Sequence, residues 1–168
     1  MAEHATIIGA GIVGICTSIS LLEKGFEVVL IDRDEPAEGA SHGNAGVISP
    51  WTCVPQSMPG LWRNIPKWLV DPEGPVAVRW GYLPKFLPWS FKFLAAGNEA
   101  VLPGIADAMQ ALNRPNVDLY RQLLDGTGHE HLIADSMYVH VFRNPANANL
   151  KQLAWRIREE RGVPLEAV

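Results

Sequence analysis

The chain has 168 residues, 48% of them hydrophobic, so it is large enough and apolar enough to build the core of one soluble globular domain. Its formal net charge is −4 at pH 7 and no run of Lys or Arg stands out, which argues against a nucleic-acid-binding surface. No apolar run reaches the roughly 18 residues of a spanning helix, and the N-terminus lacks the basic start of a signal peptide, so we expect a cytoplasmic protein. The two cysteines lack metal-ligand spacing, so we expect no metal site.

The first 32 residues predict a strand, a helix and a second strand. Residues 5–8 form an apolar, partly β-branched run, which is typical of a strand buried on both faces of a parallel sheet. Residues 12–24 carry apolar or small side chains at helical spacing and end before Gly25, a residue that often follows the last turn of a helix. Residues 26–31 form a second apolar run. The sequence therefore predicts a βαβ unit that closes in about 30 residues.

A glycine motif lies where the first predicted strand meets the helix. In Gly9-x-Gly11-x-x-Gly14, the first glycine permits a tight turn, the second lets the backbone approach a pyrophosphate, and the third lets helix and strand pack closely. The helix N-terminus then offers unpaired N–H groups and a partial positive charge. Asp32 ends the second strand, where an acid can bind a ribose hydroxyl and disfavours the 2′-phosphate of NADP, or can simply cap a loop. The unit thus predicts a site for the ADP part of NAD or FAD.

The segment after this unit consists almost wholly of very small residues. Residues 39–46 show neither a strand nor a helix period, so they predict a loop or a nonstandard helix start. Small residues would let the backbone approach a flavin ring and its ribityl chain, although a glycine-rich turn without a ligand fits equally well. His42 in this loop is either a covalent flavin attachment point, a base near the substrate, or a residue without a chemical role.

The remainder of the chain predicts mostly short helices. Nine of the thirteen prolines lie between Pro50 and Pro103, which leaves room only for short helices, one of them over residues 83–96. A longer amphipathic helix is predicted over residues 104–124, and Pro115 should kink or split it. Further along, residues 137–142 alternate weakly and predict a strand, and residues 149–161 predict a final helix that stops at Gly162.

Three stretches resemble the FAD-dependent oxidoreductases of the D-amino-acid oxidase superfamily, most closely their D-amino-acid dehydrogenase small-subunit branch. They are residues 7–14, residues 40–50 (Ala-Ser-His-Gly-Asn-Ala-Gly-Val-Ile-Ser-Pro), and the pair formed by Asp-Pro-Glu-Gly-Pro at 71–75 with Arg-Trp-x-Tyr-Leu-Pro at 79–84. The resemblance implies an α/β fold that is incomplete here. It would comprise the N-terminal βαβ of a Rossmann-like FAD-binding domain over 1–50, a Pro/Trp-rich helical segment over 51–135 and the start of a substrate domain over 136–168.

The resemblance also implies FAD as cofactor and a set of residues that bind it. Asp32 would bind the adenosine ribose, Arg33 would lie on the adenine side, and the glycine motif would hold the pyrophosphate. The cofactor-binding residues implied are Ile8, Gly9, Ala10, Gly11, Ile12, Val13, Gly14, Asp32, Arg33, Ser41, Asn44, Ala45 and Gly46. The implied reaction is oxidation of an amino acid, with D-amino acids as the expected substrates, by hydride transfer to the flavin, which yields an oxo acid and ammonia. No catalytic side chain is identified.

Partners follow from two further features. The Trp-rich stretch over 51–93 is interpreted as packing between domains, as an access lid, or as a peripheral membrane contact on the inner face of the plasma membrane. Family members are much longer, and two parallel strands do not make a doubly wound sheet, so we expect a fragment, a truncated product or half of a split protein, with a completing chain or a homo-oligomer as partner. The alternatives are an NAD-dependent dehydrogenase domain, which predicts further βα units after residue 46, and a non-catalytic remnant that acts by association.

Overall fold

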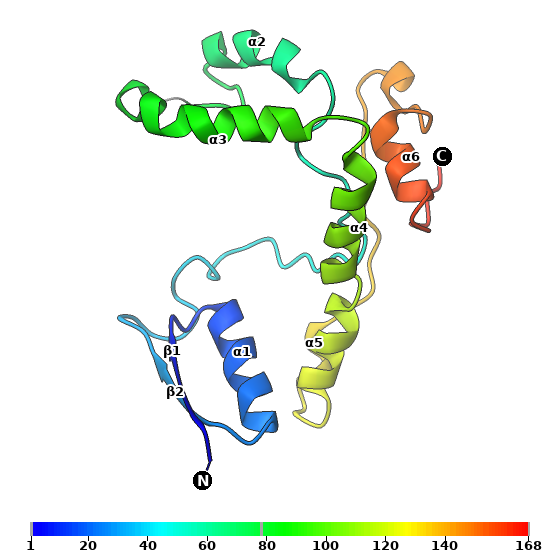
Figure 1. Ribbon diagram of the computed structural model, residues 1–168. Helices are drawn as coiled ribbons and strands as arrows, with labels where there is room; N and C mark the ends of the chain where they lie inside the picture. Colours follow the sequence, from blue (N-terminus) through cyan, green and yellow to red (C-terminus); the bar gives the residue numbers. More distant parts are fainter. Residues whose placement is uncertain (1, 78, 168) are drawn as a thin grey trace. The chain divides into compact units, whose positions relative to one another are not determined.

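The computed structural model describes residues 2–77 and 79–167, which divide into two compact units (Figure 1). Unit 1 comprises residues 1–47 and unit 2 comprises residues 48–168. Unit 1 holds both strands of the described chain, and unit 2 is helical. No helix in the described part of the chain is long and apolar enough to cross a membrane. The finer division at 135/136 within unit 2 stays a prediction.

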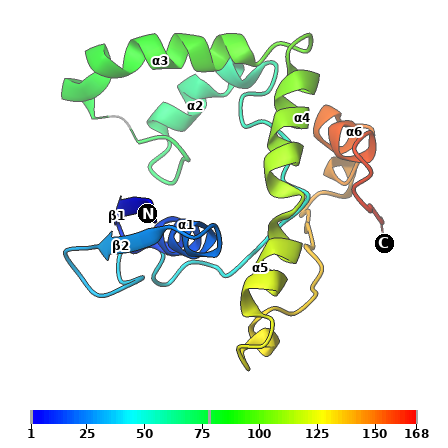
Figure 2. The same ribbon diagram turned by 60° about the horizontal axis from the view of Figure 1, so that its bottom comes forward.

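Unit 1 is the predicted strand-helix-strand unit. Strand β1 (His4–Ile8) leads through the glycine turn into helix α1 (Ile12–Glu23), and strand β2 (Glu27–Ile31) returns parallel to β1 (Figure 2). The register pairs His4 with Glu27 at one end and Ile8 with Ile31 at the other. Gly25 has a φ of 87°, and its N–H donates to the Leu22 carbonyl, so a glycine ends α1 as predicted.

The sheet is covered on one face, whereas burial on both faces was expected. Every second residue of β1 and β2 is half-buried, and these residues lie on the face toward α1: Ala5, Ile7, Val28 and Leu30. On the opposite face Ile8 is 87% exposed and Val29 and Ile31 are at least half exposed. Two strands and one helix supply a cover for one side only, which is the physical reason for the difference.

Unit 2 begins with the short helices that the prolines predict. They are the 3₁₀ turns η1 (Leu61–Arg63) and η2 (Trp80–Tyr82) and the α-helices α2 (Ile65–Val70) and α3 (Leu83–Ala96). Helices α2, α3 and α4 (Leu102–Asn113) each have a proline in their first turn, where its missing N–H costs nothing.

The predicted long helix is split at Pro115. Helix α4 (Leu102–Asn113) and helix α5 (Asn116–Leu124) are separate, with Pro115 as the N-cap residue of α5. Proline has no N–H to donate to the preceding turn and its ring opposes the helix, so the ladder breaks there. Short 3₁₀ turns follow at η3 (Glu130–Leu132) and η4 (Pro145–Asn147).

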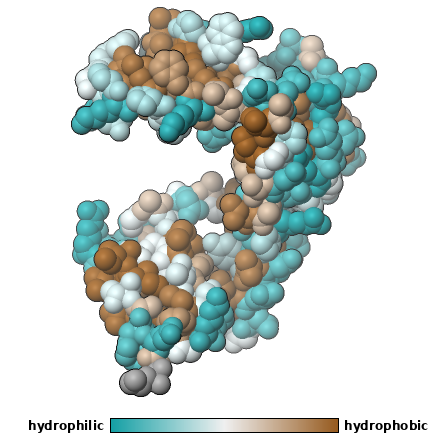
Figure 3. All heavy atoms as spheres, in the orientation of Figure 1, coloured by the Kyte–Doolittle hydropathy of each residue, from teal (hydrophilic) through white to brown (hydrophobic). Residues whose placement is uncertain are grey.

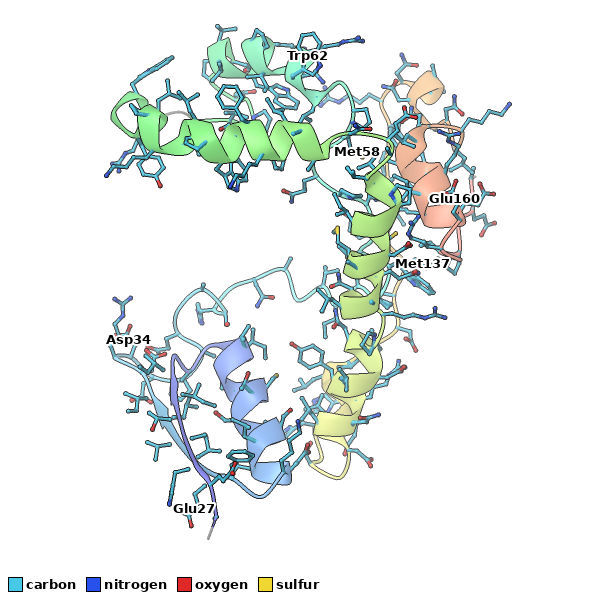
Figure 4. The ribbon with its side chains drawn as sticks, viewed as in Figure 1. Glu27, Asp34, Met58, Trp62, Met137 and Glu160 are labelled. Atoms are coloured by element: carbon cyan, nitrogen blue, oxygen red, sulfur yellow. The ribbon has the colours of Figure 1, made fainter. Side chains whose placement is uncertain are left out.

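Two predictions near the end of the chain are wrong in detail. Residues 137–142 form no strand: no described strand pairs with them, and Met137, Val139 and Val141 are largely exposed (Figure 4). The last helix, α6 (Leu153–Glu159), is shorter than the predicted 149–161. The Asn149 side chain accepts from the Lys151 N–H at 2.9 Å, and this turn delays the helix start.

A small core joins α4, α6 and the segment before η1. Its buried members are Cys53, Leu102, Ala106 and Ile157. Next to it the largely buried Arg161 donates to the Pro103 carbonyl at 2.9 Å and pairs with Asp107 at 2.7 Å. These bonds tie the end of α6 to the start of α4.

Candidate cofactor site

The site begins with a turn that only glycine makes without strain. Gly9 follows β1 with a φ of 107°, and its N–H donates to the Ile31 carbonyl at 2.7 Å. A side chain at this φ is strongly disfavoured. The turn therefore joins the ends of both strands and directs the chain into α1.

Gly14 is required by the close packing of α1 on the turn. A Cβ at Gly14 would lie 1.8 Å from the Gly9 carbonyl oxygen and 3.5 Å from the Ile7 side chain. The first distance is far inside any van der Waals contact. A Cβ at Gly11 would lie 3.2 Å from the Ser41 hydroxyl oxygen, which is a tight but less severe contact. Glycine is thus favoured at all three positions of the motif, by backbone conformation at Gly9 and by steric contact at Gly11 and Gly14.

Asp32 is held against the glycine turn. Its Oδ2 accepts from the Ala10 N–H at 2.6 Å, and its Oδ1 accepts from the Asp34 N–H at 3.2 Å. The Ala10 N–H, followed by that of Asp34, keeps the pKa of Asp32 below its usual range. The group is therefore a carboxylate at neutral pH, exposed to solvent and with lone pairs free for a ribose hydroxyl.

The N-terminus of α1 is capped from a distant loop. The cap residue Gly11 has no side chain, and the Ser41 hydroxyl accepts from the Ile12 N–H at 2.9 Å in its place. The first amides of a helix have no acceptor within the helix, so those of Ile12, Val13 and Gly14 need one from outside. Val13 is 77% exposed. An anion such as a phosphate fits here, because the Val13 and Gly14 amides and the helix dipole favour negative charge beside a glycine-rich turn.

Sequence reasoning missed Ala37. The loop after β2 folds back so that the Ala37 N–H donates to the Ala10 carbonyl at 2.8 Å, and Ala37 takes a φ of 67°. Ala10 therefore binds Asp32 through its N–H and Ala37 through its carbonyl. Alanine is not a usual residue for positive φ, so no pattern in the sequence marks this position.

Other predicted residues lie apart from this arrangement or support it indirectly. Asn44 shapes its own turn: its side chain donates to the Ser41 carbonyl at 2.7 Å and accepts from the Gly46 N–H at 2.7 Å. Ala45 is exposed, and Arg33 extends into solvent and pairs with Asp34 at 3.0 Å. Residues 39–46 form turns without a helix, which answers the open choice between a loop and a helix start.

The structure therefore brings together the glycine motif, Asp32 and Ser41. The backbone of Ile8, Ala10, Ile12 and Val13 belongs to the same turn and helix start. His42 contributes its N–H to a turn through the Gly39 carbonyl. Within residues 2–77 and 79–167, no three His, Cys, Asp or Glu side chains group in a way that could hold a metal ion.

Comparison with known proteins agrees with this geometry. The family model described as FAD dependent oxidoreductase matches residues 4–168. A D-amino-acid oxidase of Bradyrhizobium diazoefficiens is 41% identical over 164 residues, which cover 96% of this chain and 39% of the relative. A D-amino acid dehydrogenase of Phenylobacterium zucineum is 31% identical over 172 residues, covering 95% of this chain and 38% of the relative.

Further relatives carry the same kind of name over shorter alignments. D-amino acid dehydrogenase 2 of Ralstonia nicotianae is 37% identical over 94 residues, covering 55% of this chain and 22% of the relative. The chain thus spans less than two fifths of the length of each of these relatives. No solved structure matches the chain.

The NAD alternative is not supported. It predicted further βα units after residue 46, but the described part of unit 2 contains no strand. The matching family is FAD dependent. The resemblance stated from the sequence and its cofactor are therefore confirmed.

Proposed function

The chain belongs to the family of FAD-dependent oxidoreductases, and from this premise we propose that it forms the ADP-binding end of a flavoenzyme that oxidises D-amino acids to oxo acids and ammonia. One observation carries the proposal. The glycine turn, the Asp32 carboxylate and the first amides of α1 converge at the carboxyl ends of two parallel strands. This is where dinucleotides bind in folds of this class.

We assign the following roles to the chain's own residues. Asp32 accepts hydrogen bonds from the adenosine ribose, and the amides at the start of α1 bind the pyrophosphate. Ser41 already bonds to the Ile12 N–H, and its hydroxyl can donate to a phosphate oxygen at the same time. We further propose that Arg33 lies on the adenine side of the site. The ribityl chain and the flavin ring would contact Asn44, Ala45 and Gly46.

A bound FAD would supply the electron acceptor for hydride transfer from the substrate Cα, and the imino acid formed would be hydrolysed by water to the oxo acid and ammonia. The protein's part in such chemistry is to hold the cofactor and orient the substrate. The substrate class rests on the printed names of the relatives, which are D-amino-acid oxidase and D-amino acid dehydrogenase.

We propose that a further stretch of polypeptide completes the site, whether it continues this chain or comes from another. The exposed face of the β1–β2 sheet and the unpaired extended segment at 137–142 both present apolar side chains that folded proteins normally cover. On this view residues 1–50 are part of the FAD-binding domain, 51–135 a helical segment and 136–168 the start of the substrate domain.

Co-expression tests the proposal. The chain would be produced together with a polypeptide that corresponds to the unmatched remainder of the Bradyrhizobium relative, and purified by a tag on the chain alone. We expect FAD to be retained and its visible absorbance to be bleached by D-alanine under anaerobic conditions, but not by L-alanine. Retained FAD that no D-amino acid bleaches would refute the substrate class while leaving cofactor binding intact.

A further inference from the structure

Ala37 lies in a tight turn that folds back onto the glycine motif. The turn runs from Glu35 to Glu38 and is closed by the Glu38 N–H, which donates to the Glu35 carbonyl at 3.2 Å. Ala37 is its third residue, and among the described residues it is the one non-glycine residue with a positive φ. Glycine or asparagine is usual at such a position, because a Cβ is disfavoured there. The conformation of Ala37 is therefore strained and depends on contacts elsewhere.

The contact that holds Ala37 is made with the centre of the glycine motif. The Ala37 N–H donates to the Ala10 carbonyl at 2.8 Å, while the Ala10 N–H donates to the Asp32 carboxylate at 2.6 Å. Ala10 itself is only 3% exposed. Both peptide groups that flank Ala10 are thus fixed, one by the carboxylate of Asp32 and the other by the backbone of Ala37.

The same bond sets the direction of the Gly11 N–H. The Ala10 carbonyl and the Gly11 N–H belong to one planar trans peptide group, in which they point in opposite directions. Holding the carbonyl at Ala37 therefore holds the N–H away from it. A carbonyl that accepts a hydrogen bond also makes the N–H of its own amide a stronger donor. The Gly11 N–H donates to no acceptor among the described residues, so it is available to a ligand.

The side chains around Ala37 are unsuited to contact a phosphate. Residues 34–38 contain three acids and no cation: Asp34, Glu35 and Glu38. Figure 3 shows hydrophilic residues at this end of unit 1, where Figure 4 labels Asp34. Carboxylates repel a phosphate, and the Ala37 side chain is exposed and packs on nothing that it could hold. The turn can therefore serve a phosphate site only through the backbone that it holds.

We propose that Ala37 is a positioning residue of the ADP site, which orients and polarises the Gly11 N–H for the pyrophosphate through the Ala10 carbonyl. The proposal rests on the proposed function and adds to it a residue outside the glycine motif. A donor that is already held in place loses little freedom when the phosphate binds. The strain at Ala37 is thus tied to the binding of the cofactor.

Ala37→Val in the full chain tests the proposal, with Ala40→Val as the matched control. A β-branched residue fits a positive φ even less well than alanine, whereas Ala40 is exposed in the same loop and has no positive φ. In titrations of the ¹⁵N-labelled chain with ADP, Ala37→Val should raise the dissociation constant about three- to tenfold. Ala40→Val should change it by less than about twofold. Before ADP is added, the Gly11 amide proton signal should move upfield in Ala37→Val alone, because this donor is less polarised.

Ala37→Gly keeps the N–H and removes the strain. It should bind ADP as tightly as the unsubstituted chain, and the amide of residue 37 should be protected from hydrogen exchange about threefold more strongly. Weaker protection of this amide would overturn the proposal.

Two further results would also overturn it. One is equal ADP binding by the two valine variants. The other is a loss of unit 1 stability in Ala37→Val that moves neither the Gly11 signal nor the dissociation constant, since Ala37 would then be merely structural. An unsubstituted chain that binds no ADP would instead refute the proposed cofactor site, and the Gly11 signal would still decide whether Ala37 orients this amide.

Discussion

Gly14→Ala tests how closely α1 packs on the glycine turn. The added methyl group would lie 1.8 Å from the Gly9 carbonyl oxygen, so helix and turn must separate by more than about an ångström. Overpacking of this kind costs about 1–3 kcal/mol, and alanine returns up to about 1 kcal/mol through its better helix propensity. We expect unit 1 to lose about 1–2 kcal/mol of local stability.

The assay must observe unit 1 alone. All tryptophans and tyrosines follow residue 50, so fluorescence reports only on unit 2. Hydrogen exchange followed by mass spectrometry resolves peptides of β1, α1 and β2, and in Gly14→Ala these should exchange about five- to thirtyfold faster. Peptides of unit 2 should be unchanged.

Gly39→Ala is the matched control within the same unit. A Cβ at Gly39 meets nothing within 4 Å, and its φ is outside the left-handed region, so the substitution should have almost no effect. Equal exchange of α1 in Gly14→Ala and Gly39→Ala would refute the packing argument.

Three further substitutions test the contacts around the site and the core. Ser41→Ala removes the cap of α1, so the first amides of this helix should exchange about fivefold faster; Ser20→Ala, an exposed change on the same helix, should not. Asp32→Asn should reduce the loss of unit 1 stability in acid, measured as the urea midpoints of the unit 1 NMR signals. Arg161→Lys keeps the charge but loses the planar fork that reaches both the Pro103 carbonyl and Asp107, and should cost unit 2 about 1–3 kcal/mol in urea titrations followed by fluorescence.

The sign of the Asp32 effect follows from its lowered pKa. A carboxyl whose pKa is lower in the folded state stabilises the fold above its unfolded value, about 3.9, and this contribution is lost as the pH falls through the folded value. Unit 1 of the unsubstituted chain should therefore lose stability as the pH falls into the acid range. Unit 1 of Asp32→Asn should lose less stability over the same range. A urea midpoint of unit 1 that falls equally in acid in both proteins would contradict this role of Asp32. For Arg161→Lys, an unchanged urea midpoint in the fluorescence titration would contradict the role of the Arg161 side chain in unit 2.

The sequence predicts those parts of the fold that short-range rules control. The apolar runs, the helical spacing of small and apolar residues and the proline positions are local signals, and they located β1, α1, β2, α3 and the break at Pro115. Ser41 came from the family likeness, and its place at the start of α1 depends on a loop that returns across 29 residues.

The failures occur where distant parts of the chain decide the structure. Residues 137–142 have a strand-like pattern, but a strand needs a neighbour, and the described chain supplies none. The positive φ of Ala37 arises from its bond to the Ala10 carbonyl, which local propensity does not encode. The outer face of the sheet is likewise exposed because, within unit 1, α1 is the one described helix that packs on the two strands, which the residues of the strands alone do not reveal.

The most direct test of the central claim is an NMR titration of the ¹⁵N-labelled chain with ADP and then with FAD. If the glycine turn holds the ADP part of FAD, the amide signals of Gly11, Ile12 and Gly14 shift with both ligands, and Asp32→Asn weakens both titrations. A folded chain whose glycine-turn amides stay unmoved at saturating FAD, while its other signals remain dispersed, would contradict the claim.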